Sequence, residues 1–181
     1  MPRLVAVLVT LVLAALPCAG QEPRGEKLAP YVPSPRPVVE RMLEAADLKP
    51  GEMVYDLGCG DGRILITAAE KFKAKGVGVE LSRALVKEAQ ERVKHLGLQN
   101  WIQIIHGDLL DVDVSPADVV TLYLLTSSNA RLKPKLEMSL RPGTRVVSHD
   151  FAMRGWKPSR VEKVEVSHRV HTIYVYQIKK N

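Results

Sequence analysis

Residues 54–64 read VYDLGCGDGRI. A short apolar run leads into three glycines at alternate positions, Gly58, Gly60 and Gly62, and from Arg63 onward apolar residues recur at the spacing of a helix. Strand, glycine-rich turn and helix in this order are typical of the first unit of a doubly wound α/β sheet. Ligands of such sheets bind at the carboxyl ends of the strands, so we expect the ligand site at this turn.

The rest of the chain continues to alternate between strand and helix patterns. Helices are expected at residues 38–46, 63–73, 82–96 and 129–140, and Pro134 is expected to bend the last of them or to mark its start. Strands are expected at residues 53–57, 76–81, 102–105, 118–125, 145–148, 161–166 and 172–178. This order predicts a doubly wound, Rossmann-like sheet that is mostly parallel and has an antiparallel edge.

Composition limits the chain to an ordinary globular protein. Its 181 residues suit one domain, and 46% hydrophobic and 25% charged residues exclude a disordered or collagen-like chain. The 26 basic and 20 acidic residues give a net charge of +6, which suits either a solvated basic surface or an acidic partner. Cys18 and Cys59 are the only cysteines, too few for a disulfide framework or a cysteine zinc site, and we expect no metal.

The N-terminal residues read as an export signal. A basic start at Arg3 precedes 13 nearly uncharged residues at 4–16, fewer than the roughly 20 that span a bilayer. We therefore expect a signal peptide at residues 1–20. The chain is then exported, or membrane-anchored if the segment stays uncleaved; it is cytoplasmic if the start codon is misassigned. Residues 21–37 hold five prolines and are expected to form an extended arm before a domain at 38–181.

Acidic residues around the glycine turn indicate which ligand it binds. A dinucleotide site reads G-x-G-x-x-G, but the glycines here are one residue closer together, and Asp56 and Asp61 frame them. Two carboxylates repel a phosphate and attract an ammonium or sulfonium group. This favours S-adenosylmethionine over NAD.

Two further acids follow the next two strands. Glu80 ends the second strand, 22 residues after Gly58, and is placed to accept hydrogen bonds from both ribose hydroxyls. Asp108 follows the third strand, where it is placed to accept from an adenine amino group while Leu81 and Leu109 bracket the ring. Together with the glycine turn, these positions predict an S-adenosylmethionine site.

These motifs also carry a family resemblance. Residues 54–64, 76–80 (GVGVE) and 107–109 (GDL) resemble the class I, seven-stranded S-adenosylmethionine-dependent methyltransferases across residues 31–178. The resemblance implies the sheet order 3-2-1-4-5-7-6. It also implies that the cofactor is contacted by a set of residues from these three motifs, namely Asp56, Gly58, Cys59, Gly60, Asp61, Gly62, Glu80, Leu81, Asp108 and Leu109.

A narrower resemblance is carried by other segments. Residues 31–34 (YVPS), 61–64 (DGRI), 145–151 (RVVSHDF) and 155–158 (GWKP) are similar to the small protein-lysine methyltransferases of archaea and mitochondria. The resemblance implies that Tyr31 and its neighbours fold over the cofactor. It also implies that the chain methylates lysine ε-amines of other proteins.

Methyl transfer is an in-line displacement, so its main demand is an aligned, neutral nucleophile. Tyr123 at the end of the fourth strand is a candidate for orienting a lysine amine, or it packs in the sheet. Asn129 is placed either to contact the substrate or to cap a helix. His149 is either structural or a proton acceptor. The fourth strand lacks the Asn/Asp-Pro-Pro-aromatic run that the resemblance associates with adenine and glutamine methylation.

Several alternatives remain open at this point. The chain is a protein-lysine methyltransferase, a small-molecule O-, N- or S-methyltransferase, or a noncatalytic adenosylmethionine-binding module. Nucleic-acid methylation, suggested by the net charge, ranks below these. About 160 residues after the signal leave no room for a lid domain, and an uncovered cleft suits a protein substrate. We expect a monomer that contacts a membrane only through an uncleaved N-terminal segment.

Overall fold

The computed structural model describes residue 25 and residues 28–179. The predicted signal peptide at residues 1–20 lies outside the described residues. Within the part that is described, no helix is both long enough and apolar enough to cross a membrane. Residues 28–35, which we call the N-terminal arm, precede the first helix.

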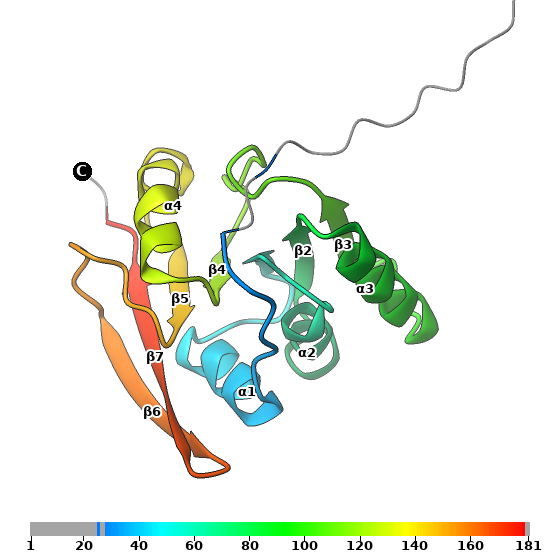
Figure 1. The fold of residues 1–181 in the computed structure, drawn as a ribbon, viewed down its shortest axis with the longest axis horizontal. Helices are drawn as coiled ribbons and strands as arrows, with labels where there is room; N and C mark the ends of the chain where they lie inside the picture. The colour runs from blue at the N-terminus through cyan, green and yellow to red at the C-terminus, as the bar shows by residue number, and fades with distance from the viewer. Residues whose placement is uncertain (1–24, 26–27, 180–181) are drawn as a thin grey trace, which may run out of the picture.

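The described residues form four helices and seven strands (Figure 1). The helices are α1 (Arg36–Ala45), α2 (Arg63–Phe72), α3 (Arg83–His95) and α4 (Thr126–Ser139). The strands are β1 (Met53–Leu57), β2 (Lys75–Glu80), β3 (Ile102–His106), β4 (Val119–Leu122), β5 (Arg145–His149), β6 (Arg160–Val166) and β7 (Arg169–Gln177).

The strands form one sheet in the order β3-β2-β1-β4-β5-β7-β6. Strands β1 to β5 are parallel to their neighbours among themselves, and β7 runs antiparallel to both β5 and β6. Figure 1 shows the β6–β7 hairpin at one edge, and β3 with α3 at the other. The predicted fold class and strand order are confirmed.

Alternation along the strands separates two hydrophobic layers. On β1, Val54 belongs to the cluster shared with α1, α2 and α3, whereas Tyr55 belongs to the cluster shared with α4. On β5, Val147 and Val146 divide in the same way. Successive side chains of a strand point to opposite faces, so three helices cover one face and α4 covers the other.

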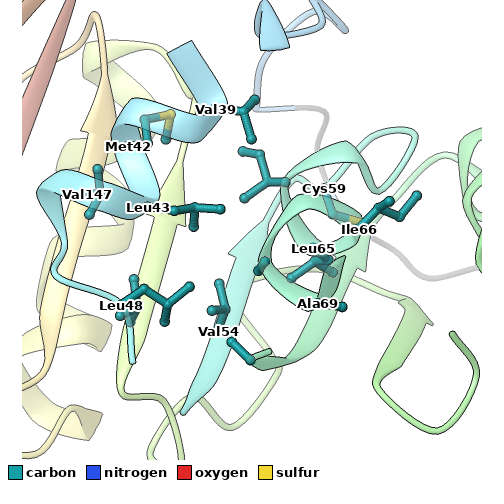
Figure 2. Packing of buried hydrophobic residues seen from close by; sticks show 14 of the residues in the cluster. Val39, Met42, Leu43, Leu48, Val54, Cys59, Leu65, Ile66, Ala69 and Val147 are labelled. Atoms are coloured by element: carbon teal, nitrogen blue, oxygen red, sulfur yellow. The ribbon is translucent and has the colours of Figure 1, made fainter. Parts of the chain in front are cut away.

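Helix α1 is fixed by its apolar side (Figure 2). Met42 and Leu43 are fully buried in one cluster with Leu65 of α2, Val54 of β1 and Val147 of β5. Complete burial of such side chains stabilises the fold by about 1.5–3 kcal/mol each. Because the N-terminal arm leads directly into α1, this packing also fixes where the arm ends.

Two helices begin earlier than the periodicity predicts. Helix α1 starts at Arg36, inside the predicted arm, with Pro35 as its N-cap and Pro37 in its first turn. The first turn is where a helix tolerates proline, because its amide there needs no partner. Helix α4 starts at Thr126 and contains Pro134 in its interior, so Pro134 does not mark its start.

Two strands also differ from expectation. Strand β4 ends at Leu122, so residues 123–125 leave the sheet at its carboxyl edge. Strand β7 begins at Arg169, because β6 and β7 are joined by a two-residue turn at Ser167 and His168. Both turn residues have positive φ angles, 51° and 63°, as a tight hairpin turn requires.

Candidate active site

A cavity of about 350 Å³ opens where β1, β2 and β4 end. Its size lies within the roughly 300–1,000 Å³ that is usual for small-molecule sites. Eleven of the thirteen predicted site residues line it: Tyr31, Asp56, Gly58, Cys59, Gly60, Asp61, Glu80, Leu81, Asp108, Leu109 and Tyr123. Gly62 and Asn129 do not line it.

The glycine turn is tied to β2 through its backbone. The amides of Gly58 and Cys59 both donate to the carbonyl of Val79, at 2.9 and 3.0 Å. Gly60 has a φ angle of 53°, and a Cβ there would lie 2.5 Å from the Tyr31 ring. The Cys59 side chain is buried in the hydrophobic cluster (Figure 2), and burial raises the pKa of its thiol. The turn therefore meets the cavity mainly with backbone.

Asp56 places an unpaired acceptor at this turn. The side chain is 2% exposed, and one oxygen accepts a 2.8 Å hydrogen bond from the Thr121 hydroxyl. The other oxygen, Oδ2, has no partner. Burial raises the pKa of Asp56 to about 7, and the nearby charges of Glu80 and Asp61 raise it further. A buried unpaired acceptor is costly, and a cationic ligand in the cavity would satisfy it.

Glu80 joins two backbone segments of the site. Its Oε2 accepts from the amide of Gly60 at 3.0 Å, and its Oε1 accepts from the amide of Ser82 at 2.8 Å. Each carboxylate oxygen has a second lone pair, so Glu80 can still accept from two ligand hydroxyls. This agrees with the ribose-binding role expected for it.

Asp61 differs from expectation, because arginines neutralise it. Its carboxylate forms an ion pair with Arg63 at 2.7 Å and a second with Arg92. Partial burial raises the pKa of Asp61, but the hydrogen bond and charge of Arg63, together with Arg92, outweigh burial and lower it overall. The uncompensated acids at the glycine turn are therefore Asp56 and Glu80, not the predicted pair of Asp56 and Asp61.

The third station lies beyond β3. Leu81, Asp108 and Leu109 all line the cavity, as expected for residues around an adenine ring. One Asp108 oxygen accepts from the amide of Leu110 at 2.9 Å. The other lies 2.8 Å from where a Cβ on Gly25 would be, so the start of the described chain approaches this station.

The N-terminal arm closes one side of the cavity, and seven consecutive residues, 28–34, line it. Figure 1 shows this segment crossing the ends of the strands before it enters α1. Arg63 donates to the carbonyl of Ser34 at 3.0 Å, and the Ser34 hydroxyl lies 2.9 Å from Nδ1 of His149. Only Tyr31 of this segment was predicted from the sequence, because an irregular segment has no periodicity that shows which side faces a ligand.

Tyr123 has two environments. It lines the cavity from the position directly after β4, and its ring stacks on His149 with centroids 3.8 Å apart. Burial, followed by the charge of Asp150, raises the pKa of Tyr123. The residue thus both packs against the sheet and faces the ligand site.

Asn129 and Gly62 serve the frame around the site. Asn129 is fully buried, and its side-chain amide donates to the carbonyl of Phe151 at 2.9 Å. It is not a cap, because the N-cap position of α4 is Leu125. Gly62 is the N-cap of α2 with a φ angle of 77°. Asn129 as a substrate contact stays a prediction that the cavity does not support.

Residues 56–160 match the model of the ANTKMT methyltransferase domain. The chain belongs to this methyltransferase family. The matched residues extend from Asp56 in the glycine turn to the start of β6, and so include most of the cavity lining described above.

Curated relatives of this methyltransferase include lysine methyltransferases. It is 52% identical over 150 residues to a protein-lysine N-methyltransferase from Saccharolobus islandicus, a match that covers 82% of this chain and 93% of the relative. It is 31% identical to an ATP synthase lysine N-methyltransferase of Xenopus laevis, over 94% of this chain and 73% of that protein.

Among solved structures, this methyltransferase is similar to an RNA methyltransferase from Salinibacter ruber in complex with S-adenosyl-L-homocysteine. The two are 47% identical with a TM-score of 0.78, over 83% of this chain and 95% of the other. These relatives differ in their named substrates, but each is a methyltransferase.

Proposed function

We propose that this chain is an S-adenosylmethionine-dependent protein-lysine N-methyltransferase. The observation that carries the proposal is the buried, unpaired Asp56 oxygen in a cavity that also presents Tyr123 at the end of β4. Relatives at 52% and 31% identity are lysine methyltransferases, and a neighbour at 47% identity was solved with S-adenosyl-L-homocysteine.

The cavity residues fit this cofactor. Asp56 offers its free oxygen to the amino group of the methionine part, and Glu80 offers lone pairs to the ribose hydroxyls. Asp108 is the acceptor for the adenine amino group. When bound, the cofactor supplies a methyl group on a positively charged sulfur, a centre that a neutral amine attacks directly.

The chain's own residues have to position that amine and keep it neutral. The Tyr123 side chain is a polar group of the cavity wall at the edge of β4, placed to accept a hydrogen bond from the amine. The arm residues 28–34 exclude water from one side. Desolvation disfavours the charged form of lysine, so a covered site lowers the pKa of an entering ε-amine from its usual value near 10.4.

RNA is the second candidate substrate. The Salinibacter ruber neighbour is named an RNA methyltransferase at 47% identity, and the net charge of +6 suits a polyanion. We rank it second because two curated relatives that cover most of this chain act on lysine.

Labelling distinguishes the two candidates. The purified chain is incubated with methyl-labelled S-adenosylmethionine and an extract divided into protein and RNA fractions, and labelled protein is hydrolysed to amino acids. We expect label in methyl-lysine, and none with Asp56→Asn. Label confined to RNA would establish the second candidate, and label in neither fraction would overturn both.

We also propose that residues 1–20 act as a signal peptide and that the mature chain is a monomer. The basic start and the 13-residue apolar run support the first point. Intact-mass measurement of the chain purified from its native source should show a product that begins at Gln21. A mass that includes Met1 or Pro2 would contradict cleavage, and size-exclusion chromatography with light scattering tests the monomer.

A further inference from the structure

Two imidazoles and a carboxylate meet behind Tyr123, outside the cavity lining. His149 ends β5, Asp150 follows it, and His171 lies on the adjacent strand β7. Nε2 of His149 and Nδ1 of His171 are 2.9 Å apart, and each lies 3.4 Å from Oδ2 of Asp150. We propose that these three residues bind a divalent transition-metal ion of the zinc type.

The distances suit such an ion. Three atoms with these separations lie about 2 Å from a common centre, close to the lengths of zinc–imidazole and zinc–carboxylate bonds. Two imidazoles and one carboxylate are donors that bind zinc, and iron(II) sites use the same set. Both imidazoles are buried, at 0% and 3% exposure, so the donors are already held together without an ion.

Surrounding contacts orient two of the donors. The other ring nitrogen of His149, Nδ1, lies 2.9 Å from the Ser34 hydroxyl, which directs Nε2 toward the proposed centre. Oδ1 of Asp150 accepts from the Thr172 amide at 2.8 Å, leaving Oδ2 to face the imidazoles. Asp150 also has a φ angle of 58°, an uncommon backbone conformation for a residue other than glycine.

Arg169 competes for the same oxygen. Its guanidinium lies 3.1 Å from Oδ2 of Asp150, but its side chain is 61% exposed. A guanidinium at the surface can turn into solvent when an ion takes its place, and such partly exposed pairs are weak. The ion would then lock His149 beneath the Tyr123 ring, 3.8 Å away.

Cobalt(II) is the probe, because it replaces zinc and absorbs visible light when imidazoles bind it. The full chain, without an affinity tag and freed of metal by chelator and dialysis, is titrated with Co²⁺ and then with competing Zn²⁺. We expect one equivalent to bind with a visible spectrum that Zn²⁺ abolishes. His171→Gln and Asp150→Asn should lose it, and His95→Gln, at an exposed position on α3, should keep it.

Arg169→Gln tests the competition and leaves all three donors intact. It should bind Co²⁺ about fivefold more tightly, the effect of removing a partly exposed ion pair. Ser34→Ala should bind about tenfold more weakly. Absence of the spectrum in the parent chain, or its survival in a folded His171→Gln variant, would overturn the site. Because the readout is metal binding, failure here leaves the proposed methyl transfer untouched.

Discussion

The Thr121 hydroxyl on β4 donates a 2.8 Å hydrogen bond to one oxygen of Asp56 on β1, while the other oxygen of this buried carboxylate has no partner. The structure thus satisfies half of the acid and leaves half for a ligand. Asp56→Asn removes the charge and should weaken S-adenosyl-L-homocysteine binding by about 10- to 100-fold. Calorimetry measures the change, and Thr121→Val should have a smaller effect. Equal affinity of parent and Asp56→Asn would contradict this role.

The pH dependence of stability should report the same residue. The folded ligand-free chain keeps a proton on Asp56 up to a pKa of about 7, whereas the unfolded chain releases it near 3.8. The unfolded state therefore binds fewer protons in this window, and the contribution of Asp56 to stability falls as pH rises from about 4 to 7.

Asp61 acts in the opposite direction, because its pKa is lowered and its contribution is lost as pH falls. The difference between Asp56→Asn and the parent removes this background. We expect the variant to gain about 2 kcal/mol relative to the parent between pH 5 and pH 8, at up to about 1.4 kcal/mol per pH unit. Urea denaturation at both pH values measures it, and a difference independent of pH would rule out a raised Asp56 pKa.

Glu80 should contribute to ligand affinity through its charge and its two amide contacts at 3.0 and 2.8 Å. Glu80→Gln keeps the shape but replaces one acceptor oxygen with a donor. We expect a loss of about 1–3 kcal/mol in S-adenosyl-L-homocysteine binding by calorimetry. The control is Glu91→Gln, since Glu91 is exposed on α3; if both variants bind alike, Glu80 is not a ligand contact.

Gly60 and Tyr31 should be energetically coupled. A Cβ at Gly60 would lie 2.5 Å from the Tyr31 ring, so Gly60→Ala has to displace the arm as well as strain a backbone with positive φ. The loss of ligand affinity caused by Gly60→Ala should therefore be smaller in a Tyr31→Ala background. A double-mutant cycle on S-adenosyl-L-homocysteine binding measures the coupling, and strictly additive losses would exclude this contact.

Asn129 and Tyr123 should separate when stability and turnover are measured together. Asn129→Ala removes the buried donor to the Phe151 carbonyl and should lower the free energy of unfolding by about 1–3 kcal/mol, with turnover per folded molecule unchanged. Tyr123→Phe should keep stability and cofactor affinity but slow methylation of a lysine substrate by about 10- to 100-fold. The reverse pattern would make Asn129 the substrate contact.

Most of the fold could be predicted, because it is encoded locally. The hydrophobic periodicity and the glycine turn at residues 58–62 indicate strands and helices in order, and the resemblance supplied the sheet order. The glycine turn, Glu80 and Asp108 were identified correctly as cavity residues because each follows a strand, and parallel strands bring their carboxyl ends together.

What the sequence could not predict depends on distant contacts. Asp61 reads as a free acid, but Arg92, 31 residues later on α3, pairs with it. The expectation of no metal considered only cysteines; His149 and His171 lie 22 residues apart and meet only because β7 pairs antiparallel with β5. The early start of α4 was missed because its first turn lacks a cap signal in the sequence.

The arm that walls the cavity makes the polypeptide part of its own ligand's surroundings. Whatever occupies the cavity touches residues 28–34, so filling the pocket and seating this stretch are two sides of one thermodynamic cycle. A ligand that gains affinity from the seated arm strengthens its seating by the same factor. A fluorophore or a tether attached ahead of residue 28 would consequently sense, and in return adjust, the occupancy of a pocket that it never contacts.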